Sequence, residues 1–271
     1  MKARGCLILI VAISVLYVNS VKCQVVEDGL ISYWSFDAPD VKGNTVIDLV
    51  GGNDGTTVGA LKHVKGKIGQ AFEFGGDPDV IDVESPTNGS LDFGDDQDFS
   101  MMAWIKVDEP PALGGGQSTI ISKGDGGGNA RILWKIVSTQ IQVTIANESG
   151  GGPKIDFNSV GDVVDGKWHH VLFIADRSDA TRIYIDGKLD AEGGPSEGTD
   201  VTTESPLFIG ASVRIGETTR RYFEGLIDEV GIYNRVLTDN EILRNYNSQG
   251  LAVSPQEKLA VTWGEIKVLR Y

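Results

Sequence analysis

Short runs of β-branched and aromatic residues recur from residue 30 to residue 233, each bounded by Gly, Asp, Asn or Pro. Such runs form strands, because branched and aromatic side chains fit a pleated surface and the flanking residues allow turns. The recurrence restricts the chain to an all-β fold. The predicted strands are residues 30–36, 56–61, 71–74, 80–83, 99–107, 119–123, 131–137, 140–145, 154–157, 168–175, 182–185, 207–210 and 223–233.

Two local motifs refine this prediction. Asp186-Gly187 predicts a tight hairpin, because a type I′ turn requires positive φ at both central positions. Thr238 and Glu241 fit a capping box, and the residues after them predict one short helix that ends before Gly250. The strands at 99–107 and 168–175 alternate only partly, so we expect them at the centre of a sheet. We therefore predict an antiparallel two-sheet sandwich with one short C-terminal helix.

The N-terminus has the layout of a secretory signal peptide. Lys2 and Arg4 precede an apolar run at 6–18, which is too short to span a bilayer comfortably. The segments that end at Ser20 and at Cys23 both fit a cleavage site. We predict a signal peptide at 1–23, one domain at 24–250 and an extension at 251–271. The expected location is extracellular or periplasmic, without membrane insertion after cleavage.

The charge balance limits the classes of binding partner that we expect. The chain has 38 acidic and 24 basic residues and a formal net charge of −14. Nucleic acids and anionic membranes bind clustered Lys and Arg, so both are excluded as expected partners. Both cysteines lie in or beside the predicted signal peptide, so we expect no disulfide in the mature domain.

Several segments, in order, resemble laminin G-like jelly-roll domains of the concanavalin A-like lectin/glucanase superfamily. They are ISYWSFD at 31–37, DLVGGNDG at 48–55, GQAFEF at 69–74, FSMMAWIK at 99–106, IISK at 120–123, DGKWHHV at 165–171, IYIDGK at 183–188 and FEGLIDEVGIYNR at 223–235. The resemblance covers roughly residues 28–248. It implies a two-sheet jelly roll that binds extracellular ligands, and it leaves the ligand open.

The resemblance also implies a calcium site. Calcium-bearing relatives draw ligands from the first strand, the loop after it and the IDE strand, which correspond here to Asp37, Asp48, Asn53 and Asp228. Carboxylate, amide and backbone oxygens suit calcium. The alternative is that Asp48 and Asn53 form Asx turns and Asp228 accepts backbone N–H bonds. Val50-Gly51 departs from the family's Ser-Gly, which puts one oxygen ligand in doubt.

The sequence does not favour catalysis. His169 and His170 lack neighbouring Cys or Glu at metal-ligand spacing, and the resemblance makes them a structural signature. Glycanases of the superfamily carry Glu-x-Asp-x-Glu or Glu-x-Asp-x-x-Glu, whereas Glu224, Asp228 and Glu229 are spaced differently. On a regular strand, Asp228 and Glu229 would also face opposite ways. We expect no enzyme, and a glycoside hydrolase is the distant alternative.

The expected ligand is a glycan, and the rival is an extracellular protein partner bound by a structural or adhesive module. Aromatic rings stack on sugar faces and planar polar groups read hydroxyls. Candidates for such contacts are Trp134, Arg131, Tyr184 and Arg214, each of which could instead belong to ordinary sheet packing or a solvated face.

Overall fold

The computed structural model describes residues 23–85, 89–112, 115–124, 131–147, 155–212 and 221–251. The predicted signal peptide lies outside these ranges except for Cys23, and the predicted extension lies outside them except for Leu251. Within the described ranges, no helix is long and apolar enough to cross a bilayer.

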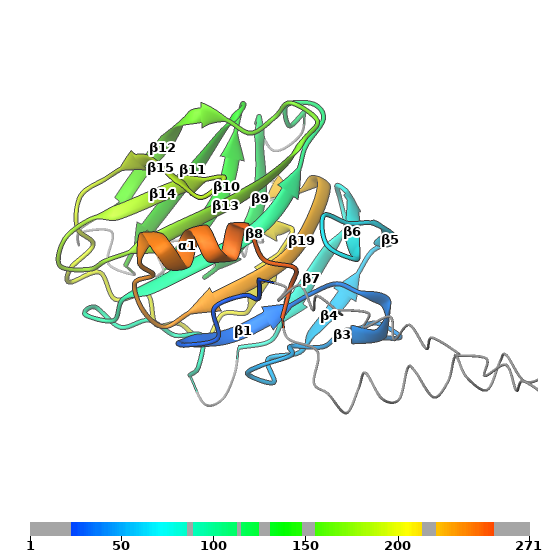
Figure 1. Ribbon diagram of the computed structural model, residues 1–271, viewed down its shortest axis with the longest axis horizontal. Helices are drawn as coiled ribbons and strands as arrows, with labels where there is room; N and C mark the ends of the chain where they lie inside the picture. Colours follow the sequence, from blue (N-terminus) through cyan, green and yellow to red (C-terminus); the bar gives the residue numbers. More distant parts are fainter. Residues whose placement is uncertain are drawn as a thin grey trace, which may run out of the picture.

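Two large antiparallel sheets form the molecule, as Figure 1 shows, and this confirms the predicted fold class. Sheet A contains, in spatial order, β15 (Lys188–Glu192), β14 (Thr181–Ile185), β13 (Trp168–Ala175), β8 (Phe99–Lys106), β19 (Glu224–Tyr233), β6 (Gln70–Gly75) and β5 (Lys62–Lys65), and β1 (Leu30–Trp34) also pairs with β19. Sheet B contains β12 (Ile155–Asp162), β11 (Gln140–Ala146), β10 (Arg131–Val137), β9 (Gln117–Lys123), β16 (Leu207–Ile209), β7 (Val80–Val83), β4 (Gly55–Val58), β3 (Thr45–Val46) and β2 (Val41–Lys42).

Apolar residues at every second position fill the space between the sheets. Ile132, Trp134 and Ile136 of β10 point inward, and so do Ile141 and Val143 of β11. The Trp134 ring meets Phe173 of β13 edge-on, at 5.4 Å between ring centroids. Because inward and outward positions alternate along a strand, the intervening side chains of β10 and β11 form the outer face of sheet B.

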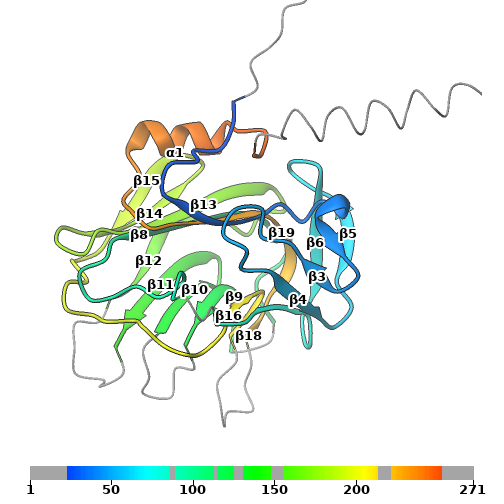
Figure 2. The same cartoon turned by 90° about the horizontal axis from the view of Figure 1, so that it is seen from below.

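A second apolar layer covers the outer face of sheet A. Val25 and Val26 of the N-terminal segment pack with Leu172, Ile174 and other buried residues of that face. Helix α1 (Asp239–Tyr246) adds Ile242, and Figure 2 shows α1 on the side of sheet A that faces away from sheet B. Strands β8 and β13 lie at the centre of sheet A, as predicted, and most of their residues are buried on both faces.

The predicted turn and cap are confirmed. Asp186 and Gly187 have φ of 51° and 76°, and Ile185 pairs with Lys188 across the turn. The Thr238 hydroxyl accepts the Glu241 N–H, and the Glu241 carboxylate accepts the Thr238 N–H, which completes the capping box.

Several short elements were not predicted. They are β2, β3, β5, β15, the 3₁₀ helix η1 (Ala38–Asp40), and the antiparallel ribbon of β17 (Ala211–Ser212) and β18 (Arg221–Tyr222). The predicted strand at 56–61 ends earlier, at Val58, because the chain turns at Gly59, whose φ is 94°. An ideal Cβ on Gly59 would lie 2.2 Å from Asp79 Oδ1, so only glycine fits there.

The edge strands of the two sheets meet at one end of the sandwich. The Asp190 carboxylate on β15 accepts the Val160 N–H of β12 at 2.6 Å and the Gly161 N–H at 3.0 Å. One side chain of sheet A thereby satisfies two backbone donors of the sheet B edge.

Candidate functional site

Asp37 and Asp228 meet the same loop between β5 and β6. Asp37 Oδ1 accepts the Gln70 N–H at 2.6 Å, and Asp228 Oδ2 accepts the N–H groups of Lys67 and Ile68 at 2.9 and 3.1 Å. An ideal Cβ on Gly66 would lie 2.6 Å from Asp228 Oδ2, so the absence of a side chain at this position lets the loop approach the carboxylate.

Asp228 has an unsatisfied oxygen. The side chain is fully buried, and Oδ1 has no hydrogen-bond partner within the described residues. Burial raises the pKa of Asp228 to about 8, and the Asp37 carboxylate acts in the same direction. A proton or a cation at Oδ1 would remove the cost of this isolated charge.

Asp48 and Asn53 belong to a different loop. Asp48 Oδ1 accepts the N–H groups of Tyr33 and Val50 at 2.8 and 3.0 Å, and its Oδ2 accepts the Asn53 N–H at 2.9 Å. The Asn53 amide donates to Ser32 Oγ at 2.7 Å and accepts from Ser90 Oγ at 3.0 Å. These are the turn-stabilising bonds of the alternative interpretation, and they hold the loop against β1.

The four predicted calcium ligands therefore do not form one cluster. Among the described residues, no group of three or more His, Cys, Asp or Glu side chains is arranged to hold a metal ion. Asp48 and Asn53 are occupied by hydrogen bonds in one loop, whereas Asp37 and Asp228 share another. Of the four residues, only Asp228 has a buried side-chain oxygen without a hydrogen-bond partner among the described residues.

The two histidines occupy different environments. His169 bonds through Nδ1 to Asp186 at 2.9 Å and through Nε2 to Asp165 at 3.1 Å, which raises its pKa. His170 is buried beside Trp104 and Tyr246, and burial lowers its pKa to about 4. Neither ring nitrogen of His170 has a hydrogen-bond partner within the described residues. The contacts of His169 and His170 are therefore structural, because they belong to side-chain packing and to the pairing of strands.

The late acidic residues lie in an irregular strand. Register shifts between Asp228 and Gly231, and Glu229 has a φ of 53°. This bulge interrupts the alternation on which the prediction of opposite faces relied. Glu229 is buried, which raises its pKa to about 8, and its carboxylate lies against Gly250.

Two of the residues considered for ligand contact are packed inside. Trp134 is fully buried between the sheets, and Tyr184 lies under α1 with its hydroxyl donating to Asp239 at 3.2 Å. The ordinary-packing interpretation is therefore the correct one for both. Arg214 lies outside the described residues, and Arg131 lines a pocket.

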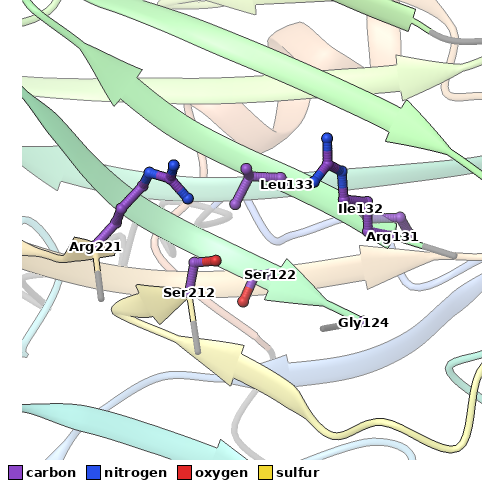
Figure 3. A pocket seen from close by; sticks show the side chains of 7 residues that line it. All are labelled: Ser122, Gly124, Arg131, Ile132, Leu133, Ser212 and Arg221. Carbon is purple, nitrogen blue, oxygen red and sulfur yellow. The ribbon is translucent and has the colours of Figure 1, made fainter. Parts of the chain in front are cut away.

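This hollow, the arginine pocket, lies where the β17–β18 ribbon meets sheet B (Figure 3). It is a shallow hollow that opens to solvent. Its lining residues are Ser122, Gly124, Arg131, Ile132, Leu133, Ser212 and Arg221. In Figure 3 the guanidinium groups of Arg131 and Arg221 lie on opposite sides of Leu133. The wall therefore combines two positive groups, hydroxyls and an apolar surface.

A family model now places the chain among known proteins. A laminin G model described as "Concanavalin A-like lectin/glucanases superfamily" matches residues 75–243. The chain belongs to this superfamily. No curated protein gives a sequence match.

Solved structures share the fold of this concanavalin A-like chain. The binding domain of Paraclostridial Mosquitocidal Protein 1 has a TM-score of 0.64 at 16% identity, over 81% of this chain and 52% of that one. Domain 4 of AbnA, a GH43 extracellular arabinanase from Geobacillus stearothermophilus in complex with arabinotriose, has 0.60 at 22%, over 80% and 98%. The binding domain of Botulinum neurotoxin DC, in complex with rat synaptotagmin II, has 0.61 at 20%, over 82% and 52%. The chain thus spans about half of each toxin domain and nearly all of the arabinanase domain.

For this concanavalin A-like chain, sequence reasoning identified Arg131 as a candidate and missed the rest of the arginine pocket. Ser122, Ser212 and Arg221 come from three different elements, and no spacing in the sequence joins them. The usable signal was Arg220-Arg221, a basic doublet in an acidic chain.

Proposed function

We propose that this chain is a non-catalytic extracellular module that binds a glycan on the outer face of sheet B. The carrying observation is the difference between the two outer faces. The outer face of sheet A is covered by the N-terminal segment and α1. The outer face of sheet B bears the arginine pocket and a row of planar polar side chains.

The polar row crosses four strands beside the pocket, β9 to β12. Gln142 Nε2 donates to Asn158 Oδ1 at 2.7 Å, and Asn158 Nδ2 donates to Gln140 Oε1 at 3.4 Å. Lys135 Nζ donates to Gln117 Oε1 at 2.7 Å. Amide groups offer both donors and acceptors, so a row of them matches the alternating hydroxyls of a saccharide. Their mutual bonds hold the side chains in place before a ligand arrives.

The comparisons favour a glycan as ligand. The arabinanase domain, which this chain covers almost completely, was solved with arabinotriose. The toxin domain solved with synaptotagmin II favours a second candidate, a protein partner on the same fold. Secretion is part of the proposal, and the predicted signal peptide and the extracellular location of that arabinanase support it.

A glycan array followed by calorimetry tests the proposal. The double substitution Gln142→Ala and Asn158→Ala should weaken binding of the best glycan about tenfold or more, because several hydrogen bonds to the ligand are lost. Gln249→Ala, an exposed amide after α1, is the matched control and should leave the affinity unchanged. Absence of binding to every glycan on the array would favour the protein partner.

The calcium part of the proposal is restricted to Asp37 and Asp228. Calcium takes about six to eight oxygen ligands, which two carboxylates alone do not supply. Backbone oxygens of the neighbouring loop and water would have to complete the shell. The ion would then join the segment between β1 and η1, β19 and the loop before β6, and would stabilise the fold. We assign it no role in ligand chemistry.

A further inference from the structure

Arg221 differs from the other described arginines. Arg182 and Arg235 bind carboxylates, Arg244 donates to the Gln24 carbonyl, and Arg177 donates to carbonyls of loop residues. Arg131 also has an interaction of its own. Among the described arginines, only Arg221 has a side chain with neither a hydrogen bond nor an ion pair.

This lack is costly for Arg221. Its Nε is shielded from water and has no hydrogen-bond partner among the described residues. An N–H group that is removed from water and finds no new acceptor destabilises the folded chain, because its hydrogen bond to water is not replaced. The chain offers 38 acidic residues against 24 basic ones, yet no described carboxylate pairs with this guanidinium.

The surroundings of Arg221 suit an anion. Arg131 on the opposite wall adds a second positive charge, and Leu133 between them supplies an apolar floor (Figure 3). The Ser122 hydroxyl donates to the Ala211 carbonyl at 2.8 Å, so its oxygen is held in a fixed place at the pocket wall. Guanidinium groups bind carboxylate and sulfate through paired, charge-assisted hydrogen bonds. A neutral hydroxyl would use only part of this capacity.

The geometry points to an acidic saccharide as the ligand: the arginine pocket holds its carboxylate or sulfate group, with Arg221 as the primary contact and Arg131 as a supporting charge. This inference rests on the proposed function and specifies its ligand class. The sugar ring that carries the anionic group would lie over Leu133 and extend toward the amide row of Gln142 and Asn158.

Calorimetry with three probes tests the inference on the full chain. The probes are an oligogalacturonate that carries carboxylates, a sulfated carrageenan oligosaccharide, and a neutral arabino-oligosaccharide of similar length. We expect one anionic probe to bind more tightly than the neutral one, and the preference between carboxylate and sulfate identifies the group. Higher salt should weaken binding of the anionic probe and leave binding of the neutral probe unchanged.

Arg221→Gln should weaken binding of that anionic probe about 10- to 100-fold, because a charge-assisted contact is lost. Arg221→Lys keeps the positive charge but lacks the planar guanidinium group. Its affinity for the anionic probe should therefore lie between those of the parent chain and Arg221→Gln. Arg244→Gln changes the net charge equally on the far side of the molecule, so it is the matched control and should bind like the parent chain. Equal melting temperatures would show that the variants are folded.

Binding of the neutral probe alone, or equal losses in Arg221→Gln and Arg244→Gln, would overturn the inference and leave glycan binding intact. If none of the probes and no array glycan binds, both the inference and the proposed function fail.

Discussion

At the scale of single residues, the buried polar groups do the most to distinguish this molecule. Arg177 is fully buried and donates to carbonyls of Gln97, Thr199 and Gly94, so one guanidinium joins two loops at the end of the sandwich. His170, by contrast, is buried with no hydrogen-bond partner among the described residues. Its contacts are the aromatic faces of Trp104 and Tyr246. A nonpolar ring should serve as well there.

His170→Phe should remove an acid-sensitive contribution to stability. Burial lowers the pKa of His170 to about 4 from 6.5, so the unfolded chain binds the proton more tightly than the folded one. The stabilisation is therefore complete above about pH 6.5 and declines as the pH falls toward about 4, by about 3 kcal/mol in total. Urea denaturation of parent and variant between pH 4 and pH 8 measures the difference.

The parent should lose stability relative to His170→Phe only in the acidic part of that range. A constant difference across the whole range would mean that the pKa of His170 is the same in the folded and unfolded chains. Comparing the two chains cancels the opposite contribution of Asp228 and Glu229, whose raised pKa values favour the folded state at lower pH.

At the scale of elements, patterns that depend on near neighbours in the sequence were predictable. The strands β7, β10 and β13 have the predicted bounds, and the Asp186-Gly187 turn and the Thr238 cap form as expected. The ribbon of β17 and β18 was not predictable, because each of its strands has two residues and gains its place from packing on β9. The bulge at Glu229 was likewise not predicted.

Loss of the cap should loosen the cover of sheet A. Thr238→Ala removes the hydroxyl that accepts the Glu241 N–H, and such caps contribute about 1 kcal/mol. Thr202→Ala, in an exposed part of a loop, is the matched control and should cost much less. Thermal melting measures both. Equal melting temperatures for the two variants would mean that α1 is held by packing alone.

At the scale of the whole molecule, the sandwich brings Asp37 and Asp228 to one loop although 191 residues separate them. The resemblance of short motifs predicted that these two residues matter together. It could not predict that Asp48 and Asn53 form a separate hydrogen-bonded loop, because which carboxylate oxygens remain free depends on backbone donors. The arginine pocket was missed for the same reason, since it joins β9, β10 and the ribbon only after folding.

Calcium should stabilise the chain through the pair Asp37 and Asp228. A ligand at about 100 times its dissociation constant adds about 2.7 kcal/mol to the free energy of unfolding. Melting with chelator and with millimolar calcium should therefore give a higher melting temperature in calcium. Asp228→Asn should abolish that shift, whereas Asp108→Asn, an exposed carboxylate, should preserve it. An unchanged melting temperature in the parent chain would exclude the calcium assignment.

The carboxylate of Asp190 affects the tendency of this protein to aggregate edge to edge at high concentration. An edge strand with free amides can recruit a strand from another molecule and begin cross-β growth. Here the amides of Val160 and Gly161 are already bound by Asp190, although the Val160 side chain itself is 77% exposed. Along this stretch, an incoming strand would have to displace an anionic acceptor before it could form its own ladder. The Asp190 contact should therefore hinder strand addition at the part of the β12 edge that carries Val160 and Gly161.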